Sequence, residues 1–373
     1  MTAVHSIITP GLIRVLEEHG QNRLEALSWW EVSLPLRRPI HHASAHEPTI
    51  DSIVVAVTVN GVIGHAEVRA NGSYGTGETG EDIEDALKTC AFLGEPVRDV
   101  TDELFKRSKL ASMAVDMAAW DALGKHRQQP LYQLLGAGPR QEVLTHAQIG
   151  FGSVDDAVGL ASRYDGEGFR RLKVRVGSSD VSDDIDRLEG IRRVVGTKTS
   201  IVADANAGWT LDQAEAILPH LKKLGVEWLE QPVATDGELA ALTATGQMRI
   251  RADESARDAA SIARLAQVHA VDGVHVKLEK TGSLARLIES ITAARGNGLA
   301  VAFGQFDQGR LGCAATTHVA AGLGFTKAEL WGCAEISQDI AGPLTISHGA
   351  VQVPQGNGLG LSVTLPGSPK GTL

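Results

Sequence analysis

Four charged residues follow short apolar segments at nearly equal distances along the second half of the chain. Asp204, Glu230 and Asp253 are acids, and Lys277 is the fourth member of the series. The steps between them are 26, 23 and 24 residues, about the length of one strand, one helix and two loops. The spacing therefore predicts consecutive parallel strands that bring these four side chains to one end of a sheet.

The three acids define the first candidate chemistry. Carboxylates that meet at one mouth repel one another unless a cation lies among them. Oxygen ligands without Cys or His favour a hard ion, so we expect Asp204, Glu230 and Asp253 to bind Mg²⁺ or Mn²⁺ and to leave coordination positions open for a substrate carboxylate. A single acid at a strand end is more often a cap or a salt-bridge partner, but three acids in register favour a metal site.

Basic residues lie beside this predicted site. In the strand-like segment 171–176, Lys173 and Arg175 alternate and share one side of the strand, which faces either the predicted metal site or a covering helix. Lys277 would be partly desolvated beside a divalent ion, and such surroundings can lower the pKa of a lysine into the range of a general base. Lys280 lies three residues further on and is expected to be a loop charge.

The segment that carries these residues alternates short apolar strands with amphipathic helices. One helix start is marked by a capping box at Thr210 and Gln213, and Gly225 ends the apolar periodicity of that helix. Eight strands with helices between most of them are what a TIM-like (β/α) barrel requires, and such barrels hold their chemistry at the carboxyl ends of the strands. The strands are expected at or near 143–150, 169–176, 201–204, 226–230, 250, 274, 299–303 and 328–331.

The first 140 residues have a different pattern. Residues 1–24 form a polar leader with a short helix expected near 12–18, and longer helices are predicted at about 81–92 and 102–125. An antiparallel meander is predicted between leader and helices, and its first two strands enclose a loop at 37–46. The strands of that meander are expected at 27–34, 52–59 and 62–68.

Three regions follow from these patterns: an α+β module at 1–140, a barrel at 141–340 and a tail at 341–373. Within the tail, 345–354 is predicted to form a hairpin, and the tail is expected to pack back on the first module. The predicted fold class is α/β, with the N-terminal region and the tail together forming an α+β capping domain.

Composition limits the possible functions. The net charge of −10 argues against general nucleic-acid binding, which needs a basic face. Cys90, Cys313 and Cys333 lack CxxC spacing and are odd in number, so they favour a reducing compartment over a disulfide framework or a zinc site. No apolar run is long enough to form a signal peptide or to span a membrane, and we expect a soluble, cytoplasmic protein.

Several motifs together resemble the enolase superfamily, and within it the muconate-lactonizing-enzyme subgroup of the mandelate racemase/muconate lactonizing enzyme family. The resemblance extends from about residue 27 to 365. Each motif alone is a weak indication of the family, but the ordered set is specific. The motifs are the segment 111–121 with Gly124-Lys125 and Leu134-Leu135-Gly136, then Lys173-Val174-Arg175, Asp204-Ala205-Asn206, Glu230-Gln231-Pro232, Asp253-Glu254-Ser255 and the segment 277–282.

The resemblance implies a capping domain over a (β/α)7β barrel, with Mg²⁺ held by the residues that match Asp204, Glu230 and Asp253. Members of the superfamily remove a proton next to a carboxylate and pass through an enediolate, with a Lys or His base and Mg²⁺. Cap loops at 41–46 and around Tyr74 are expected to close over a small carboxylate substrate. Because the family often assembles dimers or octamers, a homo-oligomer is expected as well.

Two departures from the family pattern affect the predicted reaction. The subgroup usually has Lys-x-Lys on the second strand, and its second lysine is one of two bases on opposite faces of the substrate; Arg175 occupies that position here. Because arginine stays protonated, it is a poor base and a good partner for a carboxylate. The second departure is the segment 303–309, where family members often carry Met-Leu-Glu and this chain has Gln305 and Asp307.

The leading hypothesis is a one-base cycloisomerase or dehydratase/lyase in which Lys277 is the general acid/base and Lys173 and Arg175 stabilise the enediolate. One alternative is a racemase or epimerase of an amino-acid derivative or dipeptide, with Arg175 or a loop histidine as second base. Another is a metal-binding scaffold without catalysis. A phosphate-binding barrel is disfavoured, because no glycine-rich turn follows the last strands. Candidates for substrate binding are His41, His46, Tyr74, Gln305, Asp307 and Glu335, the last being the acid that the resemblance puts at the end of the final strand.

Overall fold

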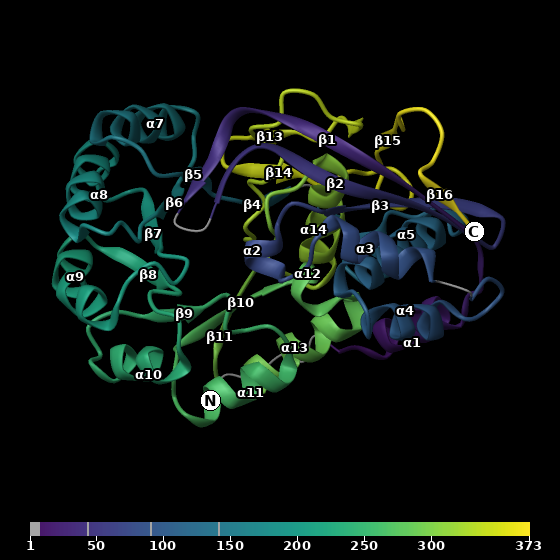
Figure 1. Cartoon of the computed structure of the whole chain (residues 1–373), viewed down its shortest axis with the longest axis horizontal. Coiled ribbons are helices and arrows are strands. Elements are labelled where there is room, and N and C mark those ends of the chain that lie inside the picture. The colour runs from purple at the N-terminus through teal and green to yellow at the C-terminus, as the bar shows by residue number, and fades with distance from the viewer. Residues whose placement is uncertain (1–7, 43–44, 90–91, 141) are drawn as a thin grey trace.

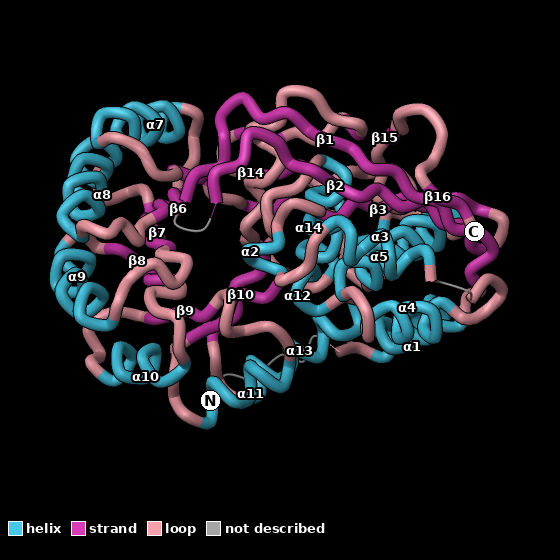
Figure 2. Tube along the Cα trace, viewed as in Figure 1, coloured by secondary structure: helices cyan, strands magenta, loops and turns pink. Residues whose placement is uncertain are grey.

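A computed structural model describes residues 8–42, 45–89, 92–140 and 142–373. Figure 1 shows a barrel of parallel strands surrounded by helices, and beside it a sheet of long antiparallel strands with a second group of helices. In the same view, Figure 2 separates the magenta strands of both parts from the cyan helices around them. Cys90 lies outside the described residues, whereas Cys313 and Cys333 are buried free thiols.

The barrel is built on parallel strands that follow one another in sequence order from β5 to β11. An eighth segment at 326–330 closes the ring, because the Glu329 amide donates to Phe303 O and the Ala328 amide donates to Leu144 O, both at 2.9 Å. The predicted (β/α)7β class is confirmed. The strands are β5 (Ala147–Ile149), β6 (Arg171–Arg175), β7 (Ser200–Asp204), β8 (Val226–Glu230), β9 (Ile250–Ala252), β10 (Gly273–Lys277) and β11 (Ala300–Gly304).

Helices connect consecutive strands and cover the outside of the barrel (Figure 1). The predicted capping box is present at the start of α9: the Gln213 amide donates to Thr210 Oγ1 at 3.3 Å, and the Thr210 amide donates to Gln213 Oε1 at 2.9 Å. That helix continues through Pro219 and ends before Gly225, as expected. The helices are α7 (Val154–Gly166), α8 (Val181–Val195), α9 (Leu211–Lys223), α10 (Asp236–Ala244), α11 (Ala259–Gln267), α12 (Leu278–Thr281), α13 (Leu284–Gly296) and α14 (Arg310–Gly322).

The capping domain contains an antiparallel sheet in the order β16-β1-β2-β3. The loop predicted at 37–46 is wrong for the described part of that segment, since β1 continues to His42, β2 begins at Ala45, and His41 pairs with His46 across the hairpin. A register shift between Pro35 and Ile40 accommodates the prolines of this stretch, so that strand pairing resumes beyond them. The strands are β1 (Leu24–His42), β2 (Ala45–Val59), β3 (Val62–Arg69) and β16 (Gly371–Thr372).

The central helix of the capping domain is α5 (Lys109–His126), which is buried along most of its length. It packs so closely on the sheet that a Cβ at Gly64 would lie 1.9 Å from Ala118 O, and only glycine avoids this clash. The helix predicted at 102–125 is split, because a new start is capped by the Ser108 hydroxyl. The other helices are α1 (Pro10–Gln21), α2 (Ser73–Thr76), α3 (Gly80–Lys88), α4 (Val97–Phe105) and α6 (Leu131–Leu134).

The tail returns to the capping domain, as predicted, because β16 pairs with β1 at Trp29 and Gly371. The predicted hairpin at 345–354 is also present, and its second strand pairs with β4 near the start of the barrel. Among the helices that the structure describes, none combines the length and the apolar character needed to cross a membrane. The short strands of this region are β4 (Glu142–Leu144), β12 (Ala341–Gly342), β13 (Ile346–Ser347), β14 (Ala350–Gln352) and β15 (Ser362–Val363).

Candidate active site

Three acids come together at the carboxyl ends of β7, β8 and β9. Asp204 is the last residue of β7, Glu230 is the last residue of β8, and Asp253 follows β9 directly. One carboxylate oxygen of each lies within 4.8 Å of the others, and all three side chains are buried. Residues that are about 25 positions apart in the sequence thus lie side by side at one mouth of the barrel.

Nearby cations keep Glu230 and Asp253 ionised in spite of burial. Burial would raise the pKa of Glu230, but Lys173 and His275 outweigh it and hold this pKa well below its usual value. Burial would also raise the pKa of Asp253, and there Lys277 reverses the effect and lowers the pKa. The three carboxylates form an all-oxygen donor set, which fits a hard divalent ion such as Mg²⁺.

Lys173 and Arg175 of β6 point into the barrel, beside Asp204. Lys173 Nζ donates to Glu230 Oε1 and to Glu329 Oε2, both at 2.7 Å, and lies 3.0 Å from Asp204 Oδ2. Arg175 Nη1 forms an ion pair with Asp204. Burial would lower the pKa of Lys173, but the surrounding carboxylates raise it well above its usual value. Both side chains are therefore fixed as cations.

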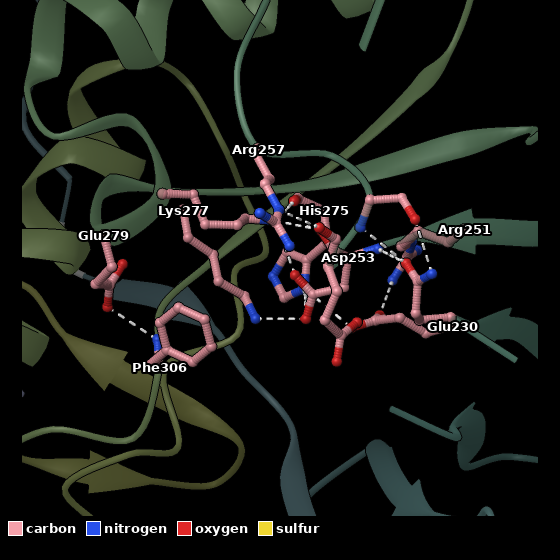
Figure 3. Close-up of polar contacts among 12 residues, drawn as sticks. Glu230, Arg251, Asp253, Arg257, His275, Lys277, Glu279 and Phe306 are labelled. Carbon is pink, nitrogen blue, oxygen red and sulfur yellow. Dashed lines mark hydrogen bonds and ion pairs between the residues drawn. The ribbon is translucent and has the colours of Figure 1, made fainter. Parts of the chain in front are cut away.

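Lys277, the last residue of β10, flanks the three acids on the other side. Its Nζ donates to Asp253 Oδ2 at 2.6 Å and lies 4.3 Å from the centre of the Phe306 ring (Figure 3). Burial would lower the pKa of Lys277, but Asp253 outweighs it and raises this pKa above its usual value. The lowered pKa expected for this lysine therefore requires a second cation to share the charge of Asp253.

A layer of charged residues beneath the three acids was not predicted from the sequence. Lys280, expected to be a loop charge, is buried in α12 and donates to Asp253 Oδ1 at 2.8 Å. Arg251 Nη1 donates to Glu230 Oε2 at 3.3 Å, and His275 Nδ1 lies 3.1 Å from Glu230 Oε1 (Figure 3). Arg251 stands two positions before Asp253, and His275 stands two positions before Lys277, so strand alternation was the signal that could have found them.

The closing segment of the barrel contributes Glu329 to this charged cluster. Its carboxylate accepts a hydrogen bond from Lys173 inside the barrel. Glu335, the acid that the sequence put at the end of the last strand, lies further along the chain and pairs with Arg38 of β1. The acid on the closing segment is therefore Glu329, whose backbone amide hydrogen-bonds to β11, and the chain has left the barrel before it reaches Glu335.

Two adjacent cavities lie next to the charged cluster. The inner cavity has a volume of 30 Å³, and its walls include Lys173, Arg175 and Lys277. The outer cavity has a volume of 530 Å³ and lies between β1 of the capping domain and the barrel. The predicted substrate-binding residues are divided between them: the inner cavity is lined by Tyr74 and Gln305, the outer cavity by His41, His46 and Glu335, and both cavities by Asp307.

The segment 305–307 lines the inner cavity together with Tyr74 and Gly75 of the capping domain. Glu279 holds this segment, because its carboxylate accepts from the Phe306 amide at 2.9 Å (Figure 3). The same carboxylate accepts from Gln308 Nε2 at 3.2 Å. On the other side, α2 of the capping domain comes so close that a Cβ at Gly75 would lie 2.4 Å from the Phe306 ring. The ring beside Lys277 is therefore positioned from both domains.

Polar and aromatic groups both line the outer cavity. Arg38 Nη2 donates to Tyr164 Oη at 2.9 Å in addition to its ion pair with Glu335. The rings of His41 and His46 meet edge to face with their centres 5.0 Å apart. This arrangement can hold an extended organic molecule whose reactive end reaches the inner cavity.

Two family models match the chain. Residues 27–136 match the mandelate racemase / muconate lactonizing enzyme N-terminal domain, and residues 156–366 match the enolase C-terminal domain-like model. The two matches correspond to the antiparallel capping sheet with its helices and to the barrel with most of the tail.

Individual relatives agree with the family models. The chain is 27% identical to the N-succinyl-L-Arg/Lys racemase of Bacillus cereus, over 91% of this chain and 95% of the relative. It is 26% identical to the chloromuconate cycloisomerase of Pseudomonas sp. (strain P51), over 91% and 96%. A solved structure of the dipeptide epimerase from Enterococcus faecalis V583, complexed with Mg and the dipeptide L-Leu-L-Tyr, has a TM-score of 0.84 at 26% identity and covers 91% of this chain and 99% of that chain.

Both halves of the chain match the same family, and the relatives that span nearly its full length are enzymes that racemise, epimerise or cycloisomerise. The chain therefore belongs to the mandelate racemase / muconate lactonizing enzyme family of the enolase superfamily, and it is an enzyme of that superfamily.

Proposed function

We propose that this enzyme moves a proton at a carbon next to a substrate carboxylate, and that it does so with a single base as a cycloisomerase or a dehydratase/lyase, through an enediolate. One observation supports this proposal above all: Lys277 and Arg175 flank the same three acids from different sides. Of these two cations, only the lysine can give up its proton under ordinary conditions.

The substrate carboxylate is assigned to the inner cavity, beside Lys173 and Arg175. Both cations are largely buried, so they attract an anionic group, orient it and stabilise the negative charge that develops on it during proton removal. Mg²⁺ held by Asp204, Glu230 and Asp253 would supply further positive charge to that carboxylate. The rest of the substrate extends into the outer cavity, whose 530 Å³ lies within the usual range of small-molecule sites.

Lys277 is assigned the proton transfer. The hydrogen bond to Asp253 and the contact with the Phe306 ring fix its Nζ on one side of the inner cavity. A base held in this way removes a proton from one face of the substrate carbon and returns a proton to that same face. Ring closure or loss of a leaving group from the resulting enediolate needs no second base.

The opposite side offers a cation that cannot exchange its proton. Burial would lower the pKa of Arg175, but Asp204 outweighs it and raises this pKa above its usual value. Arg175 therefore serves as an electrostatic partner of the substrate carboxylate, which favours one-base chemistry over racemisation.

A racemase or epimerase of an amino-acid derivative or dipeptide is the second candidate function. The relatives favour it, because the Bacillus cereus protein is named an N-succinyl-L-Arg/Lys racemase and the Enterococcus faecalis structure contains a dipeptide. This function requires a second base on the face of Arg175. It predicts that a single enantiomer is converted into its mirror image with solvent hydrogen at the inverted carbon.

Exchange of the α-proton with deuterated water tests the proposed function. Acid sugars, amino-acid derivatives and dipeptides would be incubated with enzyme and Mg²⁺, and exchange would be followed by proton NMR. Lys277→Ala should abolish exchange on any substrate that the wild-type enzyme exchanges, while Mg²⁺ binding by calorimetry remains. Lys222→Ala, an exposed lysine on α9, is the matched control and should exchange at the wild-type rate. Undiminished exchange by Lys277→Ala would remove this lysine from the mechanism.

Three further predictions concern the metal ion, the oligomeric state and the cellular location, and each can be measured directly. Mn²⁺ should replace Mg²⁺ in the exchange reaction, because the donor set is all oxygen. A homo-oligomer, either a dimer or an octamer, should be seen by light scattering. A cytoplasmic location should be seen by fractionation of cells that produce the protein.

A further inference from the structure

His146 is a buried histidine whose ring has no hydrogen-bond partner. It directly precedes β5 and is 3% exposed, and among the described residues neither Nδ1 nor Nε2 meets a donor or an acceptor. A buried polar group without a partner lowers the stability of a folded protein, so most such groups are satisfied. This ring therefore needs a partner that is not part of the described chain, either a bound ligand or a water molecule.

The other buried histidines in the described part of the chain have at least one ring partner. His19 and His275 each have a carboxylate oxygen within 3.1 Å. His318 is the closest reference, because the Tyr132 amide donates to its Nδ1 at 3.4 Å and its Nε2 lies 3.2 Å from Leu359 O. Burial lowers the pKa of His318 to about 4, so its ring is neutral as well. Among the buried histidines of the described chain, only His146 lacks a partner on both ring nitrogens, although His19 Nδ1 and His275 Nε2 also have none.

The orphaned ring reaches the inner cavity from the amino-terminal end of β5. His146 lines the inner cavity and stands two positions before Gln148, so strand alternation puts both side chains inside the barrel. Gln148 pairs in register with Lys173 and accepts from Arg175 Nη2 at 3.1 Å. The imidazole therefore belongs to the side of the cavity where the two fixed cations lie.

The surroundings keep this imidazole neutral. Burial lowers the pKa of His146 to about 3; Glu329 opposes the shift, and Lys173 and Arg175 add to it. A neutral ring has one N–H donor and one acceptor nitrogen. Beside two cations, an anionic oxygen is the group most strongly attracted to that N–H, whereas a ring of such low basicity is a poor proton acceptor.

We propose that His146 contacts the substrate and that its ring N–H donates a hydrogen bond to an oxygen of the substrate carboxylate. This inference rests on the proposed function and deepens it, because it adds a neutral donor to the two cations of the carboxylate site. The chemical class recognised is a carboxylate anion, and a primary amide in its place binds more weakly. Binding gives the ring the partner that it lacks in the free enzyme.

Two substitutions at this position test the proposal. His146→Phe keeps a ring and removes both nitrogens, whereas His146→Gln keeps a donor of similar reach. On a substrate that the wild-type enzyme exchanges, His146→Phe should lower kcat/KM by roughly 10- to 100-fold, the range for one lost hydrogen bond to a charged group. His146→Gln should recover part of this loss, and a role limited to packing would give no such rescue.

Thermal unfolding without substrate separates a binding role from a structural role. Removing an orphaned polar group should leave Tm unchanged or raise it by roughly 2 °C. His318→Phe is the matched control: it breaks the two ring contacts and should lower Tm, while KM stays at the wild-type value because His318 does not line the inner cavity.

The possible results are distinguishable. Wild-type kcat/KM in His146→Phe would overturn the inference and leave the proposed function standing. A fall in Tm as large as that of His318→Phe, or failure of His146→Phe to fold, would likewise overturn it, because both indicate a structural role. A wild-type enzyme that exchanges no α-proton in the substrate panel would overturn the proposed function, and the inference with it.

Discussion

The two sides of the barrel mouth use similar residues in different ways. On one side, Lys173 Nζ is shared among three carboxylates at 2.7 to 3.0 Å, and Arg175 pairs with Asp204. On the other side, Lys277 has one carboxylate at 2.6 Å, that of Asp253, and an aromatic ring. A cation surrounded by acids is fixed in its charged form, whereas a lysine that depends on one carboxylate can change its protonation when that carboxylate is engaged elsewhere.

Removing the acid that lies between the two sides should have the largest effect. Glu230 is held by Lys173 and is one of the three proposed metal ligands. Glu230→Gln removes a charged oxygen, so we expect weaker Mg²⁺ binding and a loss of turnover of roughly 10³-fold, the scale of several kcal/mol of electrostatic stabilisation. Calorimetric titration with Mg²⁺ and the rate of α-proton exchange measure both quantities.

The same strand provides a matched control for this prediction. Glu227 has 40% of its side chain exposed and pairs with Arg171 at the amino-terminal ends of β8 and β6, away from the three acids. Glu227→Gln should keep wild-type Mg²⁺ affinity and change the free energy of unfolding by at most about 1 kcal/mol. If Glu230→Gln bound Mg²⁺ as tightly as Glu227→Gln, Glu230 could not be a ligand.

The Lys277 side should carry a pH dependence of stability near neutral pH that comes from Glu279. Burial raises the pKa of Glu279 to about 7 from its ordinary 4.5. Between these values the folded chain binds a proton that the unfolded chain has lost, so this group should reduce the free energy of unfolding by up to about 3 kcal/mol as pH rises through 7. Glu279→Gln removes the titrating group and should gain stability over the wild type at pH 8 but much less at pH 5.

Urea unfolding at the two pH values measures this difference. The amide oxygen of the glutamine can still accept from the Phe306 amide, so the segment beside Lys277 should keep its place. A stability difference between variant and wild type that is equal at pH 5 and pH 8 would contradict the raised pKa.

Glu329→Gln should test how far Lys173 depends on its surrounding acids. Breaking a buried ion pair costs about 3–5 kcal/mol when one charge is left alone, but here Asp204 and Glu230 remain as partners. We therefore expect a smaller loss of folding free energy, seen as a lowered Tm, together with a kcat reduced roughly 10-fold. Calorimetry and steady-state kinetics measure both, and unchanged values would show that two carboxylates are enough to hold Lys173.

Arg175→Lys should have the smallest effect on rate and the most specific effect on product. It puts a group that can lose a proton on the side opposite Lys277. Exchange should stay within roughly 10-fold of the wild-type rate, and for a substrate with a stereocentre at the reacting carbon a fraction of inverted product should appear. Chiral chromatography detects it, and an active variant without any inversion would mean that the missing second base is not what limits the reaction to one face.

The sequence was informative where geometry follows directly from spacing. Asp204, Glu230 and Asp253 converge because parallel barrel strands repeat about every 25 residues and end at the same mouth. Lys173 and Arg175 face inward because strand alternation puts both on one side. The outline of the site and the fold class were therefore predictable without coordinates.

The missed residues depend on contacts that spacing does not contain. Glu329 lies in a segment with only isolated bridges to its neighbours, so its inward direction had no regular pattern behind it. Lys280 turns back to Asp253 because the chain forms the short helix α12 directly after β10. No sequence pattern points to His146, because the feature that singles it out is the lack of hydrogen-bond partners for its buried ring, which is visible only in the folded chain.

The central claim, that proton transfer occurs from the face of Lys277 alone, is tested most directly by the stereochemical course of exchange. One enantiomer of an exchanging substrate would be incubated with the wild-type enzyme and Mg²⁺ in deuterated water. The two enantiomers would then be separated, and the deuterium content of each would be measured by mass spectrometry. The account predicts deuterium in recovered substrate of unchanged configuration and none in its mirror image. Deuterated mirror image formed as fast as the exchange itself would contradict the account and would require a second base opposite Lys277.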